Sequence, residues 1–322
     1  MKKFIVLWSL LCLFSMVVVA NGANEEELAS FPQEKITIVC PYSPGGGTDA
    51  LSRILAKTAE KYMDEIVIVE NKTGGGGAVG MAAVATAKPD GYTVSMATIE
   101  VALLPQAGLA SFETSDLRPI IRVNFDPASI VVRADSPFST IEEMVEFGRK
   151  NPGKLDVMTS SFPTNFWLAT TLLEEYSGAK FNKVVAQAGA ADQIQNLLGG
   201  HIDAITVTPA EVSSHLENGA VRILGIASEE RLESFSDIPT MTEAGYDIVI
   251  GPWRALMVPA ATSDDVVSEL ERIFTQAFND QDVVDFMAQY GFGRAYLGSV
   301  EMQEDIEKQV AIFKPVIEKY KD

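Results

Sequence analysis

The fold of this chain is decided by one stretch, Pro41-Tyr42-Ser43-Pro44-Gly45-Gly46-Gly47-Thr48-Asp49. An apolar run at residues 36–40 precedes it and is typical of a short buried strand, and residues 50–62 follow with apolar side chains at helical spacing. Glycines between a strand and a helix let the backbone approach a ligand closely, and the free N–H groups of the first helical turn favour an anion. The stretch therefore predicts an anion site lined by backbone amides.

A second glycine-rich loop follows soon after the first. The run Glu65-Ile66-Val67-Ile68-Val69-Glu70 leads into Asn71-Lys72-Thr73-Gly74-Gly75-Gly76-Gly77, and a helix is predicted over residues 78–87. Each loop taken singly is also explained as a tight turn. Two loops in the same strand–loop–helix setting, however, place both helix N-termini at the carboxyl edge of a sheet, where α/β folds bind ligands. We therefore expect the two loops to form one site.

Asp49 is expected in the first turn of the helix that follows the first loop. There its charge would stabilise the helix dipole by about 0.3–1 kcal/mol. A carboxylate that pointed at a bound anion would repel it, so we expect Asp49 to bind backbone N–H groups, water or a ligand amine.

Composition and charge indicate which partners and which cellular compartment this protein has. The chain has 322 residues, which suggests about two domains, and a net charge of −19, which argues against nucleic acid or an anionic membrane surface as a partner. Lys2 and Lys3 precede an uncharged apolar run, so residues 1–20 read as a signal peptide with cleavage as late as residue 23, or alternatively as a retained N-terminal anchor. Residues 21–33 read as a flexible leader. We expect an exported protein, periplasmic or extracytoplasmic.

Strands and helices alternate along the remaining chain, which predicts the α/β class with mainly parallel sheets flanked by helices. Asp126-Pro127 is typical of a hinge, and we expect the chain to return to its first unit near Trp253 and Arg254. We therefore predict two lobes with a cleft between them, residues 34–125 plus 249–322 forming lobe 1 and residues 126–248 forming lobe 2.

Enzymatic alternatives have little support. Residues 75–80 fit G-x-G-x-x-G, and Glu100 follows at a distance suited to a ribose contact, so a dinucleotide-binding oxidoreductase is one alternative. The pattern follows the second strand rather than the first, and an exported protein rarely meets NAD. His201 and His215 are the only histidines, and neither a G-x-S-x-G nor an H-E-x-x-H motif occurs. The sequence thus predicts a non-enzyme without catalytic residues, metal site or cofactor.

Several motifs together resemble one family. The first loop is similar to the F-x-x-G-G-x-x-D signature of the tripartite tricarboxylate transporter substrate-binding receptors, also called Bug or TctC proteins, and residues 71–80 resemble their second loop. Further segments fall in the family's order: Ala87-Lys88-Pro89-Asp90-Gly91-Tyr92, Asn196-Leu197-Leu198-Gly199-Gly200-His201-Ile202-Asp203, Ile238-Pro239-Thr240, and residues 253–259. The resemblance implies a two-lobed Venus-flytrap fold of the type II periplasmic-binding-protein kind.

The resemblance also implies a function. Such a receptor binds a small organic acid (a di- or tricarboxylate, an amino acid or an aromatic acid) and delivers it to the large and small integral membrane subunits of its transporter. It would act as a monomer. The alternative function is that of an exported sensor or scaffold, which would bind the same kind of ligand, a carboxylate, for signalling.

Main-chain amides of the lobe 1 loops would hold the ligand carboxylate, and lobe 2 would close over the rest. The residues expected to bind ligand in lobe 1 are Tyr42, Ser43, Gly45, Gly46, Gly47, Thr48, Asp49, Gly74, Gly75, Gly76 and Gly77. Those expected in lobe 2 are Ser160, Ser161, Thr164, Asn165, Ala188, Gly189 and Asp192.

Departures from the family pattern concern ligand selectivity. Tyr42 stands where phenylalanine is usual, which adds a hydroxyl to the pocket. The lobe 2 loops, residues 160–165 and 186–189, lack the family's usual glycine- and serine-rich turn and its Tyr-Lys-Gly element. Phe162, Phe166 and Trp167 would form an apolar wall for an aromatic or branched acid, although Phe166 and Trp167 fit the core equally well.

Overall fold

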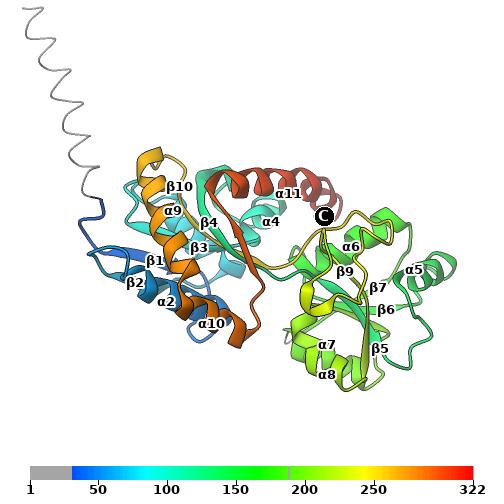
Figure 1. Ribbon diagram of the computed structural model, residues 1–322. Coiled ribbons are helices and arrows are strands. Elements are labelled where there is room, and N and C mark those ends of the chain that lie inside the picture. The colour runs from blue at the N-terminus through cyan, green and yellow to red at the C-terminus, as the bar shows by residue number, and fades with distance from the viewer. Residues whose placement is uncertain (1–30, 188, 322) are drawn as a thin grey trace, which may run out of the picture.

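The computed structural model describes residues 31–187 and 189–321. The expected signal peptide and most of the expected leader fall in residues 1–30, outside the described residues. Figure 1 shows two bodies, each with a sheet and its helices, joined by chain segments that run between them. None of the helices in the described ranges is both long enough and apolar enough to cross a membrane.

The first sheet has six strands in the order β11-β4-β10-β3-β1-β2. β1 pairs in parallel with β2 and β3, whereas β10 runs antiparallel to β3 and β4, and β11 antiparallel to β4. The strands span Ile36–Cys40 (β1), Val67–Asn71 (β2), Thr93–Thr98 (β3), Leu117–Phe125 (β4), Trp253–Pro259 (β10) and Arg294–Leu297 (β11).

Helices cover both faces of this sheet. Alternation along β1 points Ile36 and Ile38 into the core shared with α2, α9 and α10, and Val39 into the core shared with α3, α4 and α11. The helices span Gly47–Ala59 (α2), Ala78–Ala85 (α3), Glu100–Ala107 (α4), Asp264–Asn279 (α9), Gln281–Tyr290 (α10) and Ser299–Lys319 (α11).

The second sheet has five strands in the order β7-β6-β8-β5-β9. β6 pairs in parallel with β7 and β8, and β5 runs antiparallel to β8 and β9. Its strands are Ser129–Arg133 (β5), Asp156–Thr159 (β6), Asn182–Val185 (β7), Ala204–Val207 (β8) and Val221–Ile226 (β9), with helices Ile141–Lys150 (α5), Asn165–Ser177 (α6), Gly189–Leu198 (α7) and Ser213–Glu217 (α8).

The α/β class is confirmed, but both sheets are mixed rather than mainly parallel. The cause is the path of the chain. β4 leaves the first sheet at the carboxyl edge shared with β1 and β3, so β10, which returns at that edge, must run in the opposite direction. β5 likewise enters the second sheet against the direction of β8. The carboxyl edges of β1–β3 and of β6–β8 therefore both face the crossing segments.

The two crossing segments lie side by side. Asp126 N–H donates to Pro252 O at 2.9 Å, and Ala128 N–H donates to Ile250 O at 2.8 Å. A Cβ on Gly251 would lie 2.2 Å from Asp126 O, so only glycine fits this contact. The division into lobes at residues 125/126 and 248/249 stays a prediction, and these hydrogen bonds are where a hinge would act.

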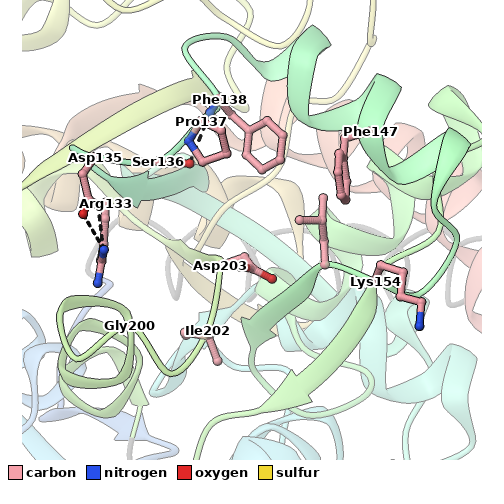
Figure 2. Close-up of a pocket in the computed structure, with 11 residues that line it drawn as sticks. Arg133, Asp135, Ser136, Pro137, Phe138, Phe147, Lys154, Gly200, Ile202 and Asp203 are labelled. Atoms are coloured by element: carbon pink, nitrogen blue, oxygen red, sulfur yellow. Dashed lines mark hydrogen bonds and ion pairs between the residues drawn. The ribbon is translucent and has the colours of Figure 1, made fainter.

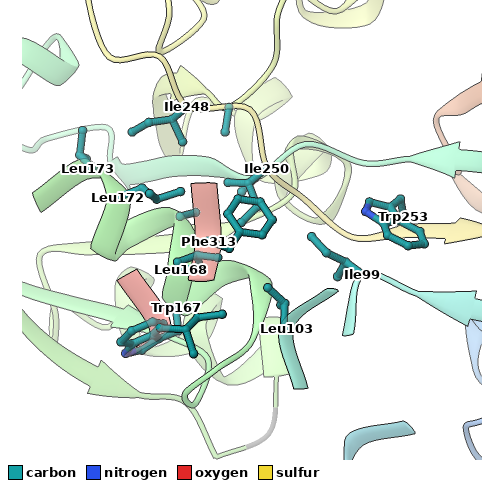
Figure 3. Close-up of a cluster of buried hydrophobic side chains, with 14 of the residues drawn as sticks. Ile99, Leu103, Trp167, Leu168, Leu172, Leu173, Ile248, Ile250, Trp253 and Phe313 are labelled. Carbon is teal, nitrogen blue, oxygen red and sulfur yellow. The ribbon is translucent and has the colours of Figure 1, made fainter. Parts of the chain in front are cut away.

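One core cluster runs from the first sheet to the second. It contains Leu103 of α4 and Phe313 of α11 together with Leu168 of α6. Figure 3 shows Phe313 between Leu168 and Ile250. At the end of α11, Lys319 Nζ lies 2.7 Å from the carboxylate of Glu175. The C-terminal helix thus packs on both bodies.

Candidate functional site

The first glycine loop connects β1 to α2. Ser43 to Gly47 are exposed, whereas Thr48 and Asp49 are buried. Gly46 is the N-cap of α2, and because glycine has no side chain it cannot cap the N–H groups of the first helical turn. Gly46 and Gly47 are exposed, so an anion at the start of α2 would find backbone N–H donors there together with the positive end of the helix dipole.

Asp49 braces this loop from behind. Its carboxylate accepts hydrogen bonds from Gly45 N–H at 2.9 Å, from Asn71 Nδ2 at 2.8 Å and from two nitrogens of Arg53. Burial alone would raise the pKa of Asp49, but the hydrogen bonds from Arg53, Gly45 and Asn71 outweigh it and lower the pKa to about 2. Asp49 binds a backbone N–H, as the sequence predicts, and its charge is neutralised within the protein.

The second glycine loop connects β2 to α3. Gly74, Gly75, Gly76 and Gly77 all have positive φ, between 58° and 132°, a run of conformations that side chains other than glycine rarely adopt. Gly80, the last glycine of the G-x-G-x-x-G pattern, packs so closely that a Cβ there would lie 2.8 Å from Pro41 Cα. This glycine brings the two loops together.

Tyr42 joins the two loops with its hydroxyl. Tyr42 Oη lies 2.9 Å from Thr98 Oγ1, 3.2 Å from Glu100 Oε2 and 3.3 Å from Gly76 O, so its single O–H hydrogen has these acceptors within reach. Burial and the nearby charge of Glu100 raise the pKa of Tyr42, so the hydroxyl stays protonated. The additional hydroxyl that the sequence places in the pocket is therefore engaged with the end of β3 and with the second loop.

Arg254 is a residue of this site that the sequence analysis did not include among its ligand-binding residues. It lies on β10, and its Nε donates to Thr48 Oγ1 at 2.9 Å across 206 residues of sequence. The guanidinium carbon sits 5.0 Å from the ring centre of Phe292, and Nη1 lies 3.6 Å from Asp126 Oδ2. The only signal in the sequence was the return of the chain to the first unit near Trp253 and Arg254.

The lobe 2 residues form a second group at the end of β6. Ser160 Oγ and Thr164 Oγ1 are hydrogen-bonded to each other, and Thr164 Oγ1 also donates to Ser161 O at 2.6 Å. Asn165, 8% exposed, has a buried Oδ1 without a hydrogen-bond partner among the described residues. These groups shape the start of α6.

The loop at the end of β7 carries the remaining expected residues. Asp192 Oδ2 accepts from Gln187 N–H at 2.7 Å, and Oδ1 accepts from Asn196 Nδ2 at 2.9 Å. Gly189 begins α7 with φ of 69°. Ala188 lies outside the described residues. The structure thus links the two lobe 1 loops through direct contacts. It places the lobe 2 residues on the loop after β6 and at the starts of α6 and α7.

Of the three aromatic residues proposed as an apolar wall, Trp167 belongs to the core. It is 7% exposed, and its ring packs edge-on against Phe162 at 4.9 Å and Tyr320 at 5.4 Å. Phe162 and Phe166 are partly buried against the same cluster.

A separate pocket of about 320 Å³ lies at the opposite end of the second sheet (Figure 2). Its charged groups largely bind the protein itself, since Arg133 pairs with Asp135 and Asp203 accepts from Asp156 N–H at 2.8 Å. Within the described part of the chain, no group of three or more His, Cys, Asp or Glu side chains is arranged to hold a metal ion.

Comparison with known proteins gives a consistent result. The family model described as tripartite tricarboxylate transporter family receptor matches residues 51–321. The chain is 29% identical to Protein BugT of Bordetella pertussis over 280 residues, covering 85% of this chain and 86% of BugT. It is similar to the crystal structure of a TctC solute binding protein from Polaromonas, with 35% identity, a TM-score of 0.85 and coverage of 90% and 99%. It also shares the fold of MatC from Rhodopseudomonas palustris with bound malate, with 23% identity, a TM-score of 0.69 and coverage of 89% and 100%.

Proposed function

Because the chain belongs to the tripartite tricarboxylate transporter receptor family, a family of solute-binding proteins, we propose that it captures a small organic carboxylate in an extracytoplasmic compartment. It delivers the ligand to the large and small membrane subunits of a tripartite tricarboxylate-type transporter. It is a binding protein and performs no catalysis.

The proposal rests on one observation: the two glycine loops are exposed, and hydrogen bonds from within the protein hold them in place. The first-turn amides of α2 are exposed at Gly46 and Gly47, while the nearby carboxylate of Asp49 is already paired with Arg53. Ionised acceptors form stronger hydrogen bonds with backbone N–H groups than neutral acceptors do, which favours a carboxylate over a neutral ligand. Since the net charge of the chain is −19, the attraction must come from this local arrangement.

Capture proceeds by closure of the two lobes about the paired crossing segments. Residues 126–128 and 250–252 are short and hydrogen-bonded to each other, as expected of a hinge that absorbs a change of backbone angles. Closure brings the loops after β6 and β7 toward the glycine loops, so that groups such as Ser160 and Asn165 contact the part of the ligand that extends from its carboxylate.

Titration calorimetry and thermal-shift measurements test the proposal. Malate, adipate, citrate, amino acids and aromatic acids are titrated into the protein, and at least one carboxylate should bind. Gly46→Val should then abolish binding without unfolding the protein, because Gly46 has an ordinary φ of −78° and a Cβ there would lie 3.6 Å from its nearest neighbour, Ser43 O. The added side chain covers the exposed amides.

Thr140→Val provides the control. Thr140 is the N-cap of α5 in the second body, and its loss costs about 1 kcal/mol of stability without touching the glycine loops. Ligand affinity should therefore stay unchanged in this variant. A Gly46→Val protein that binds as tightly as the wild type would contradict the assignment of the site.

A further inference from the structure

We propose that Arg254 determines the charge specificity of this site: its buried guanidinium, beneath the first glycine loop, makes the receptor select a charged carboxylate. This inference rests on the proposed function and assigns a residue of the same site that lies outside both glycine loops. Three features of Arg254 support it: the position of the guanidinium, its incomplete neutralisation and its contact with Phe292.

The position of Arg254 is fixed by the sheet. β10 lies between β3 and β4, where Arg254 is opposite Thr98 and Asn124. From there its Nε reaches Thr48, the second residue of α2, and a Cβ on Gly47 would lie 3.9 Å from Nη2. The positive charge is therefore directly under the first turn of the helix whose amides face the open surface.

The charge of Arg254 is only partly neutralised by the protein. Nη1 is buried and has no hydrogen-bond acceptor among the described residues. The nearest carboxylate, Asp126, lies 3.6 Å away and already accepts hydrogen bonds from Gly293 N–H and Asn124 Nδ2, both at 2.7 Å. A buried charge without full pairing is costly, and an anion bound at the start of α2 reduces that cost. Ligand charge and protein charge thus stabilise each other.

Phe292 keeps the guanidinium in place. The cation lies over the ring of Phe292, and the side chain as a whole is only 16% exposed. A planar guanidinium can stack on a ring while it donates a hydrogen bond to Thr48. A lysine ammonium carries the same charge, but on a flexible stem and without the fixed planar geometry. This difference allows charge and geometry to be separated by mutation.

The test compares Arg254→Met and Arg254→Lys with the wild type by calorimetry. The probe is whichever of malate, adipate, citrate, the amino acids and the aromatic acids the wild type binds most tightly. Arg254→Met keeps an apolar stem against Phe292 and removes the charge, so the Kd should rise at least about tenfold. Arg254→Lys should recover part of that loss. The matched control is Arg294→Met, since Arg294 also stacks on a phenylalanine, Phe278 at 4.0 Å, but belongs to β11. Its Kd should stay within twofold of the wild type.

The outcomes separate this inference from the function on which it rests. Wild-type protein that binds no carboxylate of the wider panel overturns the proposed function, and this inference falls with it. If the wild type binds a carboxylate and the Kd of Arg254→Met is within twofold of the wild-type value, only the role of Arg254 is overturned. If Arg254→Lys binds no better than Arg254→Met, although circular dichroism shows both folded, the residue acts through packing and the charge-specificity role is wrong.

Discussion

Arg254 donates a hydrogen bond from Nε to the hydroxyl of Thr48 at 2.9 Å, although 206 residues separate the two along the chain. The contact joins β10, which arrives from the second body, to the first turn of α2. Together with the ion pair between Arg254 and Asp126, it connects the glycine loop to the crossing segment. In the proposed mechanism, binding at the loop and movement at the crossing would therefore involve the same side chain.

Asp49 should make stability depend on pH in the acid range. Its pKa is about 2 in the folded protein and close to 3.8 in an unfolded chain, so its contribution is fully present above about pH 4 and is lost as the pH falls toward 2. In Asp49→Asn this loss should be absent, and the variant should be about 1–2 kcal/mol less stable at pH 7. Urea unfolding at pH 7, 4 and 3 measures both. Asp135→Asn should alter the pH dependence clearly less: Arg133 lowers the pKa of Asp135 too, but solvent screens this mostly exposed pair.

Tyr42→Phe should weaken the contact between the two loops. The variant loses the hydroxyl that bonds Thr98 and the second loop, while Thr98 keeps its hydrogen bond to Glu100. We expect a loss of about 1 kcal/mol in unfolding free energy and a modest rise in the Kd for carboxylates. Chemical denaturation and calorimetry on the same preparations measure the two effects. Unchanged stability and affinity would show that the hydroxyl does not support the loop.

Gly251→Ala should strongly destabilise the protein. The added Cβ would lie 2.2 Å from Asp126 O and 2.6 Å from Pro127 Cα, so both crossing segments must move apart. We expect a cost of about 2–4 kcal/mol, seen as a lower midpoint of thermal unfolding. Gly46→Ala is the control, because a Cβ there has room, and its stability should stay close to that of the wild type.

Tyr320→Ala should loosen the packing of α11 on the second body. The Tyr320 ring packs edge-on against Trp167 at 5.4 Å, and its hydroxyl donates to Glu175 at 3.0 Å. The expected loss is about 1–2 kcal/mol in unfolding free energy, measured by urea denaturation. Tyr176→Ala on α6 removes a tyrosine that is 48% exposed and should cost clearly less. Equal losses in the two variants would contradict a specific contact at Tyr320.

The first glycine loop and its hydrogen bond to Asp49 could be predicted from the sequence, because the residues that form them are close together along the chain. The glycine run at Gly45 to Gly47 lies between an apolar strand and an amphipathic helix, and this order alone predicts where the free amides point. The brace by Asp49 follows for the same reason, since Gly45 lies four residues away. The two motifs, and the class of fold, needed no tertiary information.

The remaining parts depend on the order and direction of the strands. Arg254 reaches Thr48 only because β10 inserts between β3 and β4 in the antiparallel direction, which alternation of strands and helices does not reveal. The position of Trp167 could not be decided for a different reason. α6 is buried on almost every face, so helical spacing does not distinguish a core position from a cleft position.

A crystal structure of the protein with the carboxylate that it binds most tightly would show where the ligand is held. We expect the carboxylate oxygens to accept hydrogen bonds from the amides at the start of α2 and from the second glycine loop, directly or through water, with Arg254 beneath them. A ligand bound elsewhere, for example in the pocket lined by Arg133 and Asp203, with the glycine loops unoccupied, would contradict this expectation.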